Sequence, residues 1–246
     1  MEAIIRNFPK ISEVALLRQL NYFKVFIFLS VVTVVTVGLY FAAADWLDQR
    51  YFRFLIWNLF LAWIPFVFSF ISYGFSEAKW RVAPWLAVAS GLLWLLFFPN
   101  ASYIVTDLVH LTARSSRYYA ENGLDYRYWY DLIVVLMFVW TGLLLGFLSM
   151  YQLQEVIYRK MGNVASWVFV LAGCALGGYG VLLGRVYRLN SWDALTNRDT
   201  LLKLMIESVS RPSLAFCLFF GVFILTIYVT LYYLMNTKLA REKNGS

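Results

Sequence analysis

Long apolar runs, separated by short polar segments, dominate the chain. A run of about 20 apolar residues matches the hydrocarbon thickness of a bilayer when it forms a helix. The runs fall at roughly residues 25–44, 54–73, 84–98, 131–151, 164–184 and 212–235. The pattern therefore predicts an all-α fold, a polytopic transmembrane helical bundle of about six spans.

The two ends of the chain have a different pattern. Residues 1–24 are too polar to span a membrane, and their apolar positions have helical spacing, which predicts an amphipathic helix in the membrane interface. Residues 236–246 form a basic C-terminal tail. We therefore expect three parts: an interfacial segment at 1–24, a six-span domain at 25–235 and the tail. Residues 199–208 are expected to form a second interfacial helix, and residues 152–163 a connecting loop.

Composition and charge narrow the class of protein. Hydrophobic residues make up 61% of the chain and charged residues only 14%, against about 25% charged in a typical soluble domain. The net charge of +7 comes from basic residues that flank the spans, and no nucleic-acid-binding module is present, so membrane lipids are the expected partners and nucleic acid is not. Lys and Arg are almost equally divided between the two sides; because the long loops lie on one of them, we expect both termini to be cytoplasmic, in a cell membrane.

The third apolar run ends in a group of polar residues. Asn100, Tyr103, Asp107 and His110 follow one another at intervals of three and four, which places them on one face of a continuing helix. His110 is the single histidine of the chain. A carboxylate and an imidazole one turn apart at a membrane boundary are costly unless they are paired or hydrated. This face is therefore the first half of a candidate site.

A second polar group follows the fifth apolar run. Arg185 and Arg188 lie three residues apart, and the residues directly after them are Asn190, Ser191, Trp192 and Asp193. Either arginine alone is explained by its side chain reaching the lipid headgroups, but the group is denser than topology requires. Glycines that share one stripe precede it, which predicts that this span packs closely at the centre of the bundle: Gly173, Gly177, Gly180 and Gly184.

The stretches FPNASYIVTDLVHL and GRVYRLNSWD together resemble a family of bacterial multi-pass membrane proteins catalogued as domain of unknown function 1361. The resemblance covers most of the chain. It implies the architecture and the importance of the two polar groups, and it assigns no activity.

Three functions remain open from the residues. In a scaffold or accessory protein of the cell envelope, Asp107, Asp193, Arg185 and Arg188 would form a salt-bridge network. In an enzyme acting on a lipid-linked or phosphate-bearing substrate, Asp107, His110, Arg185 and Arg188 would be catalytic and the other six polar residues would bind the ligand. A small transporter, or a permease component, is the third possibility. No metal and no cofactor is expected; a membrane-protein partner or a homo-oligomer is compatible with all three.

Overall fold

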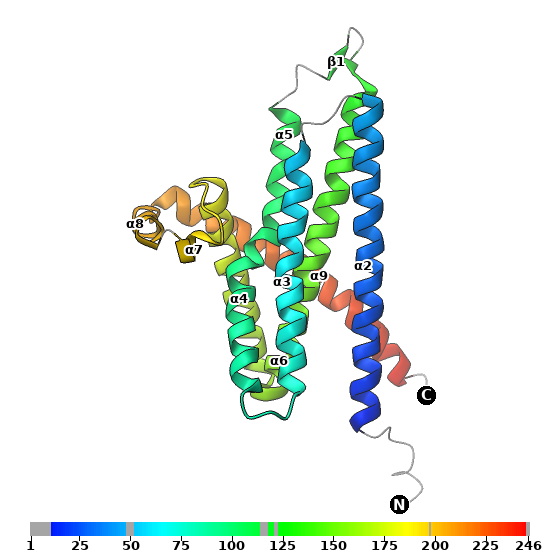
Figure 1. Cartoon of the computed structure of the whole chain (residues 1–246), viewed down its shortest axis with the longest axis vertical. Coiled ribbons are helices and arrows are strands. Elements are labelled where there is room, and N and C mark those ends of the chain that lie inside the picture. Colours follow the sequence, from blue (N-terminus) through cyan, green and yellow to red (C-terminus); the bar gives the residue numbers. More distant parts are fainter. Residues whose placement is uncertain (1–10, 48–51, 114–117, 121–122, 197, 245–246) are drawn as a thin grey trace, which may run out of the picture.

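Helices make up almost all of the computed structural model, which describes residues 11–47, 52–113, 118–120, 123–196 and 198–244 (Figure 1). Five helical stretches are long and apolar enough to cross a membrane. They are α2 (Ile11–Leu47), α3 (Arg53–Glu77), α4 (Ala83–Tyr103) with its continuation, α6 (Tyr126–Arg185) and α9 (Arg211–Asn244). The shorter elements are η2 (Ile104–Leu108), α5 (Val109–Thr112), β1 (Tyr119–Ala120), β2 (Gly123–Leu124), α7 (Asp193–Thr196) and α8 (Arg198–Glu207). The predicted all-α polytopic bundle is confirmed.

The 60-residue α6 contains two lengths that can each cross a membrane. A straight helix of that length would extend about 90 Å, but Gly162 interrupts it with a non-helical backbone (φ 87°, ψ −179°). A Cβ atom placed on Gly173 would lie 3.2 Å from the Met150 side chain, so the two halves run back beside each other. With this reversal, the five helical stretches provide the six predicted spans. The predicted loop at 152–163 is wrong, because the backbone stays helical on both sides of Gly162.

Helices continue through both predicted terminal boundaries. The backbone of α2 is helical from Ile11 to Leu47 without a break near residue 24, so the predicted interfacial segment and the first span share one helix. Neither Gly nor Pro occurs between Ile11 and Val37, and nothing local ends the helix there. Likewise, α9 extends into the predicted basic tail as far as Asn244. The function of the segment 1–24 in the membrane interface stays a prediction.

The glycine stripe in the second half of α6 packs against α4. Cβ atoms placed on these glycines would meet α4 side chains in the pairs Gly173–Trp94, Gly177–Phe98, Gly180–Pro99 and Gly184–Tyr103. On another face of the same helix, a Cβ on Gly178 would lie 2.6 Å from the Cys217 carbonyl oxygen of α9. The predicted central position of this span is confirmed, and the close packing brings the ends of α4 and α6 together.

Buried hydrogen bonds between side chains join the spans. Ser69 of α3 donates to Gln152 of α6 over 2.6 Å, and the Trp94 indole of α4 donates to Ser149 of α6 over 3.0 Å. Such polar contacts replace the hydrogen bonds that lipid cannot provide. They hold α3 and α4 in register with α6.

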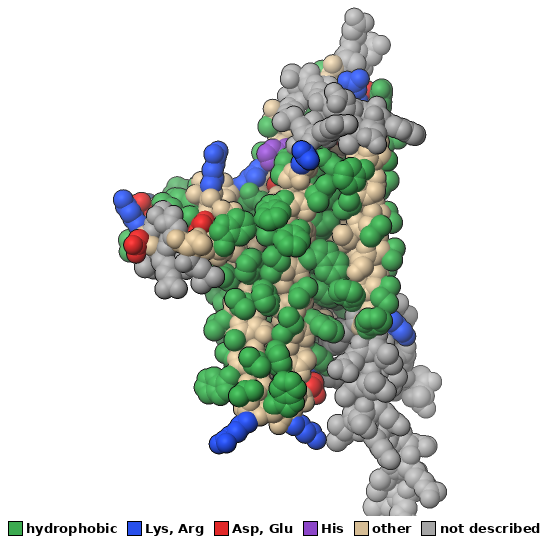
Figure 2. Space-filling view, viewed as in Figure 1, with side chains coloured by type: hydrophobic (Ala, Val, Ile, Leu, Met, Phe, Trp, Pro, Cys, Tyr) green, Lys and Arg blue, Asp and Glu red, His purple; other side chains and the backbone are tan. Residues whose placement is uncertain are grey.

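The elements lie at distinct levels along the bundle. The start of α2 and the end of α9 lie toward the end of the bundle where α3 connects to α4, whereas β1 and α5 lie at the opposite end (Figure 1). Apolar side chains cover most of the visible face between these ends (Figure 2). The second half of α6, from 163 to 185, extends about 35 Å, just enough to cross the hydrocarbon, so Arg185 marks its far boundary. From there α7 and α8 project sideways from the bundle (Figure 1).

Candidate functional site

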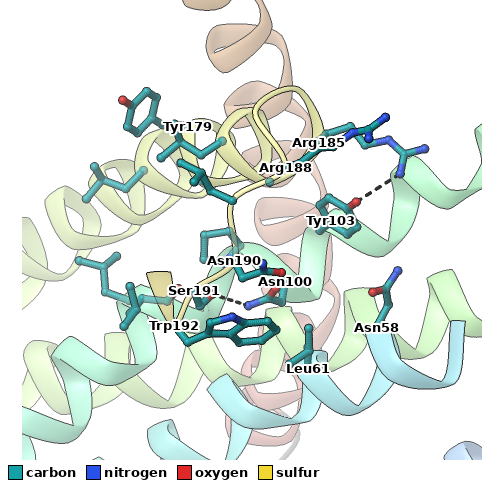
Figure 3. Close-up of a pocket in the computed structure, with 18 of the residues that line it drawn as sticks. Asn58, Leu61, Asn100, Tyr103, Tyr179, Arg185, Arg188, Asn190, Ser191 and Trp192 are labelled. Carbon is teal, nitrogen blue, oxygen red and sulfur yellow. Dashed lines mark hydrogen bonds between the residues drawn. The ribbon is translucent and has the colours of Figure 1, made fainter. Parts of the chain in front are cut away.

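A cavity of about 900 Å³ lies where α3, α4 and the second half of α6 meet the segment after Arg185 (Figure 3). Eight of the ten predicted site residues line it: Asn100, Tyr103, His110, Arg185, Arg188, Asn190, Ser191 and Trp192. The two predicted halves of the site therefore come together, although about 80 residues separate them in the sequence. The remaining two, Asp107 and Asp193, are not among the lining residues.

Asp107 lies behind the cavity wall, where its side chain is only 1% exposed. The Asn58 amide donates to its Oδ2 atom over 2.7 Å, and Nη1 of Arg185 lies 3.7 Å from Oδ1. Arg185 also donates to the Tyr103 hydroxyl and to the Thr106 carbonyl oxygen, each over 3.2 Å. Asp107 thus belongs to a network that joins α3, η2 and α6 and fixes the Arg185 guanidinium at the cavity.

The predicted polar face is built on two kinds of helix. Pro99 lies inside α4, which continues to Tyr103 and does not break there. The chain then tightens into the 3-10 helix η2, where the Thr106 hydroxyl donates to the Tyr103 carbonyl over 2.6 Å. In a 3-10 helix, residues three apart share one side, and His110 follows at the start of α5 in the cavity wall. The His110 ring packs against Phe54, with ring centroids 4.5 Å apart.

The segment that follows Arg185 is held against α4 by Ser191. The Ser191 hydroxyl donates to the Leu96 carbonyl oxygen over 3.0 Å, and the Asn100 amide donates to that hydroxyl over 2.9 Å (Figure 3). Within this segment, Arg188 has a left-handed backbone (φ 58°), which is unfavourable for a residue with a Cβ atom. Its side chain is exposed and contributes to the cavity.

Asp193 has a local structural role. Its Oδ2 atom accepts from the Asn190 backbone N–H over 2.6 Å, which closes the turn before α7. Among the described residues, neither Asp193 nor Arg188 takes part in an ion pair, and Asp107–Arg185 is the charged contact within the predicted set. The predicted four-charge network is therefore wrong: the short connection directs the Asp193 carboxylate to the Asn190 backbone N–H and leaves Arg188 at the cavity.

Comparison with known families decides the classification. The pattern of the family described as "Protein of unknown function (DUF1361)" matches residues 57–227. The chain belongs to the DUF1361 family. No curated protein and no solved structure matches it. All residues that line the cavity, from Trp57 to Met205, lie within the DUF1361 region, whereas α2 precedes it.

The DUF1361 cavity includes residues that the sequence did not assign to the site. Asn58 of α3 donates to Asp107 of η2 and also lines the cavity. Trp57 packs edge-on against Trp192, with ring centroids 6.3 Å apart. The Tyr179 hydroxyl forms a hydrogen bond of 3.0 Å with the hydroxyl of Ser208, the residue that follows α8. Aromatic residues are common at membrane boundaries, so their sequence positions gave no separate signal.

The chemistry of the lining favours anions. It contains two guanidinium groups, one imidazole and several amides, and no carboxylate is among the described side chains that line it. Arginine forks suit phosphate and carboxylate groups. No group of three or more His, Cys, Asp or Glu side chains suited to a metal ion occurs in the part of the chain that the structure describes.

Proposed function

We propose that this DUF1361 protein is a multi-pass protein of the cell membrane that binds an anionic ligand, through a phosphate or carboxylate group, in the cavity. The single observation that carries the proposal is the convergence of Arg185, Arg188 and His110 on a cavity whose described lining has no acidic side chain. A concave site with a few convergent polar groups is the usual form of a small-ligand site.

The two arginines make different contributions. The guanidinium of Arg185 is held by Asp107, Tyr103 and the Thr106 carbonyl oxygen, and its charge is compensated by the Asp107 carboxylate. Arg188 has no such compensation among the described residues. Arg188 therefore supplies the net positive charge for the ligand, and Arg185 supplies directed hydrogen bonds from a fixed position.

The ligand site suits an accessory protein of the envelope. The Asp107 network holds three helical elements in one arrangement, as a scaffold requires, and the cavity beside it gives this arrangement a ligand. A second candidate is an enzyme acting on a phosphate-bearing substrate, which the presence of His110 in the cavity wall favours. For such an enzyme, Asp107 is a positioning residue because it does not line the cavity. Transport remains a prediction of the sequence.

The charges of the short connections between helices support one orientation of the bundle in the membrane. Lys79 and Arg81 lie between α3 and α4, and Arg159 and Lys160 lie shortly before Gly162. The Glu77–Arg159 ion pair joins these two connections at one end of the bundle. Because basic residues in short loops favour the cytoplasm, this end and both termini are cytoplasmic, and the cavity lies at the outer boundary. A cysteine-free protein with Thr196→Cys should be labelled on intact cells by an impermeant maleimide; labelling only after permeabilisation would reverse the orientation.

Binding is tested on the full chain purified in detergent. Ethyl phosphate is the probe, and isothermal titration calorimetry measures its dissociation constant. Arg188→Gln should weaken binding at least tenfold, because a charge-assisted contact is lost. Arg211→Gln is the matched control, since Arg211 is exposed and does not line the cavity. Equal affinity in the unchanged protein, in Arg188→Gln and in Arg211→Gln, or no binding at all, would refute the proposal.

A further inference from the structure

The cavity has an apolar wall in addition to its arginines. Leu92, Leu95 and Leu96 contribute to it from α4, and Leu176 and Leu183 contribute from the second half of α6. Two of these side chains are also largely exposed, Leu92 by 64% and Leu176 by 48%. Because both helices are membrane-spanning segments, this exposed apolar surface faces lipid. The wall of the cavity is therefore continuous with the lipid-facing side of the bundle.

The apolar wall leads toward the polar end of the cavity. Along α4, the lining residues run from Leu92 to Asn100 and Tyr103, and eight helical residues correspond to about 12 Å. Tyr103 lies at the far end of this row, where Arg185 donates to its hydroxyl (Figure 3). The site thus changes from apolar to cationic in the direction in which a membrane changes from hydrocarbon to headgroup.

We propose that the ligand is an anionic membrane lipid that enters the cavity from the membrane and lies along α4 and the second half of α6, over the contact between these two helices. Its phosphate headgroup lies at Arg188 and Arg185, and its chain lies along the leucine wall. This inference rests on the proposed anion site and names the class of ligand for it. Charge complementarity selects the headgroup, and the exposed leucines of the wall favour a molecule that is already in the bilayer.

A water-soluble anion fits the same features less well. It would use the arginines and leave the leucine wall without a partner, whereas a chain removes that apolar surface from water. The neighbouring α8 also suits the membrane interface, since Ile206 is 76% exposed beside the exposed Lys203 and Glu207. Met205 of the same helix lines the cavity, so the cavity and the lipid surface lie at one level.

The experiment compares dodecyl phosphate with ethyl phosphate on the detergent-solubilised full chain, by native mass spectrometry for the first and calorimetry for the second. Leu92→Asn and Leu176→Asn change the wall. Leu93→Asn and Leu171→Asn are matched controls, because these leucines are 39% and 52% exposed on the same helices but do not line the cavity. We expect the wall variants to weaken dodecyl phosphate binding at least tenfold, with ethyl phosphate binding and the controls unchanged.

Each outcome has one meaning. Equal losses in wall and control variants, or dodecyl phosphate binding no tighter than ethyl phosphate, would overturn the lipid inference while Arg188-dependent binding of ethyl phosphate kept the anion site. Failure of both probes to bind would overturn both proposals. If an asparagine variant does not fold, Leu176→Phe narrows the wall without adding polarity, and it should reduce the affinity for dodecyl phosphate alone.

Discussion

The Asn58 amide donates a 2.7 Å hydrogen bond to the buried Asp107 carboxylate and so links α3 to η2. Arg185 approaches the same carboxylate from α6, at 3.7 Å. A carboxylate removed from water needs such partners, since an isolated buried charge is very costly. The contact therefore fixes the point at which three helical elements meet behind the cavity.

Asp107→Asn should lower the stability of the protein. The substitution keeps the shape of the side chain and removes the charge that Arg185 faces, at a cost of about 1–3 kcal/mol because Arg185 stays partly hydrated. Thermal unfolding in detergent measures the loss. Adding Arg185→Gln should cause less further loss than Arg185→Gln causes alone, because the two residues share one interaction. Strictly additive losses would show that the pair is not coupled.

Asn58→Leu should destabilise the protein while leaving both charges in place. Leucine fills the space but leaves Oδ2 of Asp107 without the amide donor, which costs about 1–3 kcal/mol for a buried acceptor. Thr226→Val is the control, since the Thr226 hydroxyl donates to the Val222 carbonyl within its own exposed helix turn. Similar midpoints of thermal unfolding for the two variants would contradict the importance of the Asn58–Asp107 bond.

The Asn58–Asp107 bond also shows how far the sequence could lead. Hydrophobic periodicity sufficed for the six spans, and helical spacing sufficed to bring Asn100, Tyr103 and His110 to one cavity with Arg185. Helical spacing could not show that the Asp107 side chain turns toward Asn58, because this contact depends on the packing of α3 beside η2. Nor could it separate Asp193 from the arginines, since the turn that captures its carboxylate is a local backbone feature.

Gly180→Leu should disrupt the bundle at the cavity. The space beside Gly180 is already filled by the Pro99 ring, so a larger side chain must separate α4 from α6. Overpacking of this kind costs about 1–3 kcal/mol. In Gly38→Leu, where nothing lies within 4 Å of an added Cβ atom, stability should be unchanged or higher. Thermal unfolding in detergent compares the stabilities of the two variants. Equal losses of stability would show that the glycine stripe does not set the spacing between α4 and α6.

Arg188→Gly should separate ligand binding from stability. The left-handed backbone of Arg188 (φ 58°) costs a residue with a Cβ atom about 1–2 kcal/mol, a strain that glycine does not have. Glycine also gives the unfolded chain more conformational entropy, which costs about 0.4–1 kcal/mol of stability. The free energy of unfolding should therefore stay unchanged or rise by up to about 1.6 kcal/mol. Ethyl phosphate binding should nevertheless be lost, because the uncompensated guanidinium is gone. Chemical denaturation and calorimetry on the same preparation measure both quantities. A clear loss of stability would mean that the Arg188 side chain holds the segment in place, and that its strained backbone serves the fold and not the ligand.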